Sequence, residues 1–186
     1  YLSLIVDLGF KEFKADKVYL LHSDTHLCSL CARVLKEYLV SEAEVEMIAV
    51  YGLGKVFEEG LVNLFEGILR VSRQHPHPDT VLLNATGGFK PESAIATLAA
   101  ALGNAIAVYY IHEAFREAKI IPIPALKISE DTKQLLDIAR KLEGKSTEEL
   151  KKLPKLIQNR LLLIIERREE KIKIREWIKT LMKYIY

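Results

Sequence analysis

The sequence predicts an α/β fold, with a Rossmann-like, mainly parallel sheet and flanking helices, followed by an all-helical C-terminal tail. Apolar, β-branched runs alternate with amphipathic helical stripes between residues 17 and 125. Strands that alternate with helices form right-handed βαβ units. From about residue 130 the sequence changes to charged and amphipathic helical patterns. We therefore expect a Rossmann-like domain at 1–128 and a helical region at 129–186.

The expected elements follow from apolar periodicity and from the turn residues between them. Strands are expected at 17–22, 45–50, 80–83 and 106–111, with a proline-bearing edge strand at 120–124. Helices are expected at 27–38, 57–75, 91–102 and 130–142. The apolar stripe of the first helix contains Leu27, Leu30, Cys31, Val34, Leu35 and Tyr38. We expect this face, Cys31 included, to pack in the core.

The opening segment, residues 1–8, is apolar and fits either a strand or a helix. Leu8 and Lys17 are too close for the crossover of about a dozen residues that joins parallel strands. We therefore expect residues 1–8 to be the end of a helix. The chain starts at Tyr1, so we also expect a first, mid-sheet strand and its loop to be missing from it.

The composition excludes several classes of protein. The 186 residues are 49% apolar and 28% charged, which is typical of a globular protein. The net charge of +2 does not predict a chain that binds polyanions over its whole surface. No apolar run reaches the roughly 18 residues of a membrane span, and no secretory signal is visible. We expect no membrane partner and a cytoplasmic location.

The most informative stretch is 84–92, Asn-Ala-Thr-Gly-Gly-Phe-Lys-Pro-Glu, which follows an expected strand. Gly87 and Gly88 let the backbone take positive φ and approach a ligand closely. Pro91 suits the first position of a helix. The free N–H groups of that helix start, with Lys90 beside them, make a place for a phosphate. This turn therefore predicts a nucleotide-type ligand.

Ligands of such sheets bind at the carboxyl ends of the strands. The segments expected there are Ser23-Asp24-Thr25, the turn Gly52-Leu53-Gly54, the 84–90 turn and His112-Glu113. His112 is a candidate general acid or base or simply a polar residue at a strand end, and Glu113 orders it or contacts a ribose hydroxyl. Cys28 and Cys31 have metal-ligand spacing, but a second pair is lacking. We expect neither a metal nor a cofactor.

With the 84–92 run placed after a strand, the sequence resembles the CARF domain (CRISPR-associated Rossmann fold) over about residues 17–125. Weaker likeness lies in 20–25, 57–61 and 109–115. The resemblance implies a homodimer that binds cyclic oligoadenylate, the messenger of type III CRISPR systems, at its twofold interface. It also implies that the ligand is contacted by Ser23, Asp24, Thr25, Asn84, Thr86, Gly87, Gly88, Phe89 and Lys90, with His112 and Glu113 nearby.

Two functions fit this resemblance. The first is a ring nuclease in which Lys90 stabilises charge on the phosphate while the adjacent 2′-OH attacks in line, without metal, leaving a 2′,3′-cyclic phosphate. Cyclic tetra-adenylate is the expected ring. The second is a non-catalytic sensor that acts through the tail or an absent effector. The tail contains no histidine, which argues against an RNA-degrading effector with an Arg-x4–6-His motif. An unrelated Rossmann-like nucleotide enzyme stays a third possibility.

The tail mixes both signs of charge between residues 166 and 176. Opposite charges three or four residues apart stabilise an exposed helix. We therefore favour a solvated helix over a DNA- or RNA-binding surface in this segment. A small domain, a dimerisation arm and a DNA-binding helical unit all fit the tail.

Overall fold

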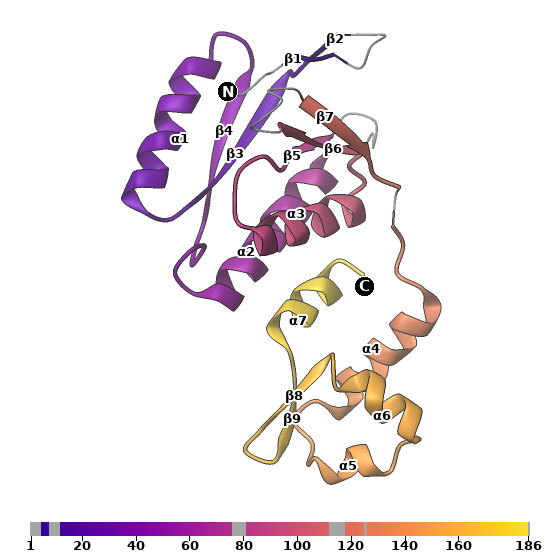
Figure 1. Cartoon of the computed structure of the whole chain (residues 1–186). Coiled ribbons are helices and arrows are strands. Elements are labelled where there is room, and N and C mark those ends of the chain that lie inside the picture. Colours follow the sequence, from indigo (N-terminus) through magenta and orange to yellow (C-terminus); the bar gives the residue numbers. More distant parts are fainter. Residues whose placement is uncertain (1–4, 8–11, 76–80, 112–117, 125, 186) are drawn as a thin grey trace. The chain divides into compact units, whose positions relative to one another are not determined.

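A computed structural model of the chain describes residues 5–7, 12–75, 81–111, 118–124 and 126–185 (Figure 1). The chain forms two compact units, residues 1–126 (unit 1) and residues 127–186 (unit 2). Strands alternate with helices in unit 1, and helices dominate unit 2. The predicted α/β fold class is thereby confirmed. None of the helices in the described ranges is long and apolar enough to cross a bilayer.

Among its described residues, unit 1 contains three groups of hydrogen-bonded strands, and two of these groups include a parallel pair. In the first, β3 (Lys17–Ser23) is parallel to β4 (Glu44–Val50). In the second, β5 (Leu82–Asn84) is parallel to β6 (Ala107–Ile111), and β7 (Ala118–Pro122) pairs antiparallel with the other side of β6. The last strand therefore lies at the edge of its group, as its proline predicts.

The first described strands correct the prediction for residues 1–8. β1 (Ile5–Asp7) pairs antiparallel with β2 (Glu12–Lys14), so the described residues 5–7 form a strand and not the end of a helix. The prediction was wrong because it considered only a parallel neighbour. Antiparallel strands need only a short connection and no crossover helix.

Three helices cover the strands of unit 1. These are α1 (His26–Leu39), α2 (Phe57–Gln74) and α3 (Lys90–Leu102). Figure 1 shows α1 on one side of β3 and β4, with α2 and α3 on the other side. The apolar face of α2 is buried as its periodicity predicts, through Leu64, Phe65, Ile68 and Leu69.

The prediction that the apolar face of α1 packs in the core was wrong. Ala32 and Leu39 are the buried residues of this helix, whereas Leu27 is 70% exposed and Tyr38 is 74% exposed. Cys31 is exposed as well and does not pack in the core. The helix is placed as predicted, but it is buried through Ala32 and Leu39, and most of its apolar stripe is exposed.

Unit 2 combines helices with a hairpin. Its elements are α4 (Glu130–Leu142), α5 (Glu148–Lys151), α6 (Lys155–Leu161), β8 (Ile165–Arg168), β9 (Lys171–Ile174) and α7 (Glu176–Lys183). Its core includes Leu136, Leu161 and Ile172, each almost fully buried. The helical C-terminal region is confirmed, except that residues 165–174 form an antiparallel hairpin where we expected a charged helix. Ile172 and Ile174 alternate with exposed lysines, which is the period of a strand.

Candidate functional site

The site is built on the carboxyl ends of parallel strands. β3 ends at Ser23, which lies opposite Val50 of β4. β5 ends at Asn84, which lies opposite Tyr109 of β6. The loops that leave these strand ends, residues 23–25, 51–56 and 84–89, carry most of the residues that the sequence predicts for the site.

Short hydrogen bonds hold the turn after β5. The Asn84 side-chain oxygen accepts from the Thr86 N–H at 2.9 Å. The Thr86 hydroxyl oxygen accepts from the Ile111 N–H at 3.0 Å, which ties the turn to the end of β6. Burial raises the pKa of the Tyr109 hydroxyl, and a hydrogen bond with Asn84 opposes this rise. The Asn84 and Thr86 side chains therefore fix the shape of the turn from within.

Gly88 lets the chain enter α3. Its φ is +100°, and an added Cβ would lie 2.8 Å from the Glu92 Oε2. That carboxylate oxygen accepts from the Phe89 N–H at 2.9 Å and so caps the helix. Gly87 differs, because nothing lies within 4 Å of a Cβ added there. The surface above Gly87 is open.

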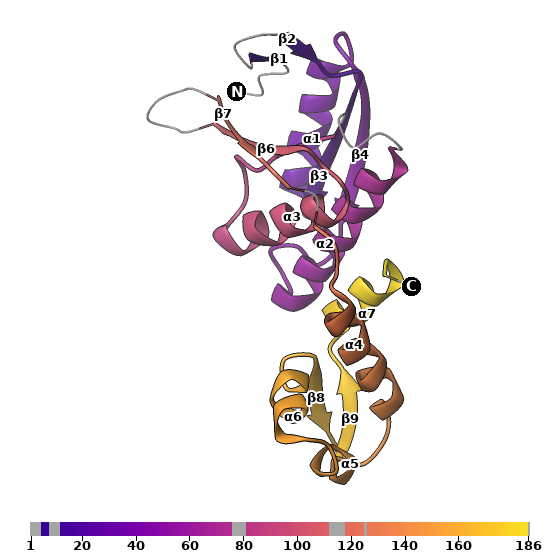
Figure 2. The same ribbon diagram turned by 90° about the vertical axis from the view of Figure 1, so that its right-hand side faces the viewer.

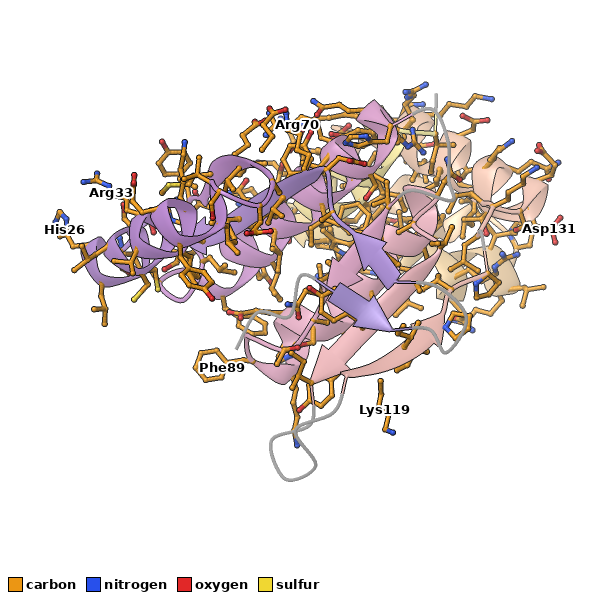
Figure 3. The ribbon with its side chains drawn as sticks, turned by 90° about the horizontal axis from the view of Figure 1, so that it is seen from above. His26, Arg33, Arg70, Phe89, Lys119 and Asp131 are labelled. Carbon is orange, nitrogen blue, oxygen red and sulfur yellow. The ribbon has the colours of Figure 1, made fainter. Side chains whose placement is uncertain are left out.

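The start of α3 presents donors to this open surface. Lys90 is exposed, and no carboxylate in the described part of the chain lies within salt-bridge distance of its ammonium group. The backbone N–H groups of Gly87, Gly88 and Lys90 make no hydrogen bond to a described residue. Phe89 is 75% exposed, and its ring projects from the ribbon in Figure 3. Such a group of donors with a cation binds anions.

The loop after β3 carries two hydroxyls and a carboxylate. The Ser23 and Thr25 hydroxyl oxygens lie 3.0 Å apart, and the Thr25 oxygen also accepts from the Cys28 N–H at the start of α1. The Asp24 Oδ2 is 3.0 Å from the Lys55 ammonium nitrogen. The Asp24 Oδ1 is buried and has no hydrogen-bond donor among the described residues.

Lys55 reaches this loop from the turn that follows β4. The turn contains Gly52 and Gly54, both at positive φ. It packs closely on α2, since a Cβ added to Gly60 would lie 2.7 Å from the Gly52 carbonyl oxygen. The sequence analysis singled out the glycines of this turn but missed the lysine. Lys55 could have been predicted as a site residue from its position in the loop that follows the carboxyl end of β4.

Cys28 lies beside the hydroxyls of the 23–25 loop. Hydrogen bonds with the Ser23 and Thr25 hydroxyls lower the pKa of the Cys28 thiol, while the negative charge of Glu92 acts to raise it. Cys28 and Cys31 are free thiols. In the described ranges no group of three or more His, Cys, Asp and Glu side chains is arranged to hold a metal ion.

The structure thus places Ser23, Asp24 and Thr25 in one loop and residues 84–90 in another, at the same end of unit 1. His112 and Glu113 lie outside the described residues. The sequence analysis did not predict Cys28 and Lys55 as site residues. Cys28 contacts the hydroxyls of the 23–25 loop, and Lys55 forms an ion pair with the carboxylate of that loop.

This fold and this strand end define a class of protein: a Rossmann-like α/β protein whose loops offer backbone donors and an exposed cation. The chain belongs to a particular family within that class. A family model described as "CRISPR-associated protein (Cas_APE2256)" matches residues 2–125, which is two thirds of the chain and nearly all of unit 1. The protein is therefore a CRISPR-associated protein.

Proposed function

We propose that this protein binds cyclic oligoadenylate, with cyclic tetra-adenylate as the preferred ring, at a homodimer interface and cleaves it without metal. The membership in a CRISPR-associated family supports this proposal. So does the CARF-like run at residues 84–92, which lies on the surface at a strand's carboxyl end. The product is linear adenylate with a 2′,3′-cyclic phosphate, and its formation ends the signal.

The observation that carries the proposal is the start of α3. Lys90 and the N–H groups of Gly87 and Gly88 face open surface and have no hydrogen-bond partners in the described ranges. The Ser23–Thr25 hydroxyl pair lies at the same end of unit 1. In cyclic oligoadenylate, the anionic phosphate oxygens can bind to the donors at the start of α3, and the ribose hydroxyls can bind to the Ser23–Thr25 pair. The exposed Phe89 ring adds a face on which adenine stacks.

The proposed chemistry needs position and charge more than a strong base. The ribose 2′-oxygen attacks the neighbouring phosphorus, the bond from phosphorus to the 5′-oxygen breaks, and the 2′-OH proton is lost as the 5′-oxygen gains one. Lys90 stabilises the negative charge that builds on the non-bridging oxygens. Backbone donors that already point at the phosphate hold the attacking and leaving oxygens in line.

The exposed stripe of α1 supports the homodimer. Leu27, Leu30, Val34 and Tyr38 are all more than half exposed and share one face of the helix. This face begins at the candidate site, because Thr25 caps the helix and also bonds to Ser23. A second copy packed on this stripe brings two copies of the 23–25 loop together. A ring with twofold symmetry fits such an isologous interface.

Labelled cyclic tetra-adenylate, incubated with the protein in EDTA, tests the proposal. We expect linear di-adenylate with a 2′,3′-cyclic phosphate. We expect Lys90→Met to slow cleavage by about 100-fold or more, as for the loss of one transition-state donor. Lys127→Met is the matched control, since Lys127 is an exposed lysine in the first residues of unit 2. Equal rates for the two variants would exclude the assigned role of Lys90.

A non-catalytic sensor is the second candidate, and the separately packed core of unit 2 favours it as an output module. The same incubation discriminates the two. Recovery of the intact ring, with binding that Lys90→Met weakens and Lys127→Met does not, would assign the site to sensing. Failure to bind any cyclic oligoadenylate, with binding of a dinucleotide, would point to a different nucleotide protein.

A further inference from the structure

The order of elements in unit 2 is that of a winged helix–turn–helix. α5 and α6 are joined by only three residues, 152–154, and α4 packs on α6. The β8–β9 hairpin follows, and Figures 1 and 2 both show it beside α6. Residues 144–147 add a third, short strand-like segment, because the Gly144 N–H donates to the Ile172 carbonyl and Ser146 bridges to Lys171. Helix–turn–helix units place their second helix against the major groove of DNA.

The charge of the chain is divided unevenly between the units. Residues 127–186 contain sixteen Lys and Arg and ten Asp and Glu, a formal net charge of +6. Residues 1–126 contain eleven and fifteen, a formal net charge of −4. The overall charge of +2 therefore conceals a basic unit. A concentration of positive charge in one unit is what attraction to a nucleic-acid backbone requires.

The exposed face of α6 carries side chains suited to a DNA groove. Lys155, Leu156, Asn159 and Arg160 are exposed, while Leu161 on the opposite face is fully buried in the unit 2 core. Arg and Asn are the side chains that pair with guanine and adenine edges in the major groove, and apolar side chains contact the thymine methyl group. Leu156 lies on this face and is 71% exposed, so it can contact such a methyl group.

The hairpin adds a second basic surface. Arg168 lies opposite Lys171, and Glu166 lies opposite Lys173, so these four residues share the face turned away from the buried Ile172 and Ile174. Arg168 is paired with Glu166 at 2.6 Å. Lys171 and Lys173 have no carboxylate within salt-bridge distance in residues 126–185. These two lysines are available for phosphates.

The tip of the hairpin is acidic and does not favour contact with phosphates. Glu169 and Glu170 occupy the tip and repel phosphate. The basic surface of the hairpin is therefore its outer strand face, not its end. Lys155 and Arg160 on α6 and Lys171 and Lys173 on β9 are all exposed, and we refer to these four as the basic residues of unit 2.

We propose that unit 2 binds duplex DNA through these basic residues, with α6 in the major groove and the outer strand face of the hairpin on the DNA backbone. This activity is separate from the handling of cyclic oligoadenylate by unit 1 and does not depend on it. Lys155, Lys171 and Lys173 neutralise phosphates. Asn159 and Arg160 meet base edges.

Fluorescence anisotropy of the full chain with a labelled random-sequence DNA duplex tests this proposal. We expect binding whose logarithm of affinity falls linearly with the logarithm of salt concentration. Each phosphate contact contributes a slope of about −0.9. Lys171→Ala/Lys173→Ala should therefore reduce the slope by about 2 and weaken binding at low salt by at least tenfold. The control, Lys127→Ala/Lys141→Ala, removes the same charge from exposed positions outside this set of basic residues.

Three results would overturn the proposal: no duplex binding at low salt, equal loss in the control and the hairpin variant, or tighter binding of single-stranded RNA than of duplex DNA. A protein-contact role for α6 would appear as a change in oligomeric state for Leu156→Lys, measured by light scattering, without a change in DNA affinity. Arg160→Ala adds a second readout. It should lower the enrichment of specific sequences when the random duplex pool is selected on the protein.

Discussion

The two neighbouring glycines of the 84–90 turn should respond in opposite ways to the same substitution. Gly88 has φ +100°, and its added Cβ would meet the Glu92 carboxylate at 2.8 Å. Gly87 does not have a positive φ, and no atom lies within 4 Å of a Cβ added to it. Gly88→Ala is therefore a test of the turn, and Gly87→Ala is a test of what approaches the turn.

The cost of Gly88→Ala can be worked from three terms. A left-handed backbone costs an alanine about 1–2 kcal/mol. Displacing the Glu92 oxygen from the Phe89 N–H removes a helix cap, which costs about 1 kcal/mol. The lower entropy of the unfolded chain returns about 0.5 kcal/mol. We expect Gly88→Ala to lower the free energy of unfolding by about 2 kcal/mol, and Gly87→Ala to change it by less than about 0.5 kcal/mol.

Urea denaturation followed by far-UV circular dichroism measures this difference. Trp177 is the sole tryptophan and lies in unit 2, so its fluorescence serves as an internal control that neither substitution should move. Binding of cyclic tetra-adenylate then separates stability from function. If a phosphate lies against Gly87, Gly87→Ala weakens binding at least tenfold although the protein is fully stable. Equal stability of the two variants would refute the reasoning about the turn, and unchanged binding by Gly87→Ala would refute the placement of the ligand.

Three further predictions concern other parts of the molecule. Leu30→Glu should convert a homodimer to a monomer in analytical ultracentrifugation and abolish ring cleavage; a dimer that persists would show that α1 is not the interface. Hydroxyl hydrogen bonds lower the pKa of Cys28, so its alkylation by iodoacetamide should begin at lower pH in the unchanged protein than in Thr25→Val; mass spectrometry of the labelled peptide measures this, and an identical pH profile in the two proteins would contradict it. Glu169 and Glu170 both have positive φ, so the pair Glu169→Asn/Glu170→Gly should raise the unfolding free energy by about 1 kcal/mol, and an unchanged Trp177 transition would contradict this.

The local parts of unit 1 could be predicted from the sequence because local signals specify them. The apolar run of β4, the stripe of α2 and the Gly–Gly turn before Pro91 each identify one element without reference to the rest. Periodicity does not specify a helix's partner, however. The stripe of α1 was recognised, but whether Leu27 and Tyr38 meet the sheet or the solvent depends on the neighbours that pack on the helix.

The rest of the site and of unit 2 depends on long-range pairing. Lys55 reaches Asp24 across 31 positions of sequence, and no local pattern predicts such an ion pair. The hairpin at 165–174 was not predicted because its pattern of charged residues fits both the helical period and the strand period. Opposite charges three and four residues apart suggested a helix, and Glu169-Glu170 is not the Asn-Gly type of turn that marks a hairpin. The burial of Ile172 against α4 and α6 decides for the hairpin.

The two halves of the candidate site are joined through helices. In the described part of unit 1, no strand ladder links β3 to β5, and all seven residues of β3 are half-exposed. Yet α2, which packs on β3 and β4, also packs on α3, which starts at Lys90. This packing is close, because a Cβ added to Gly103 would lie 2.4 Å from the buried Ser72 Cβ. The α2–α3 contact therefore sets the separation between the Ser23–Thr25 hydroxyls and the Lys90 ammonium, and a phosphate bound by both groups would stabilise that same contact.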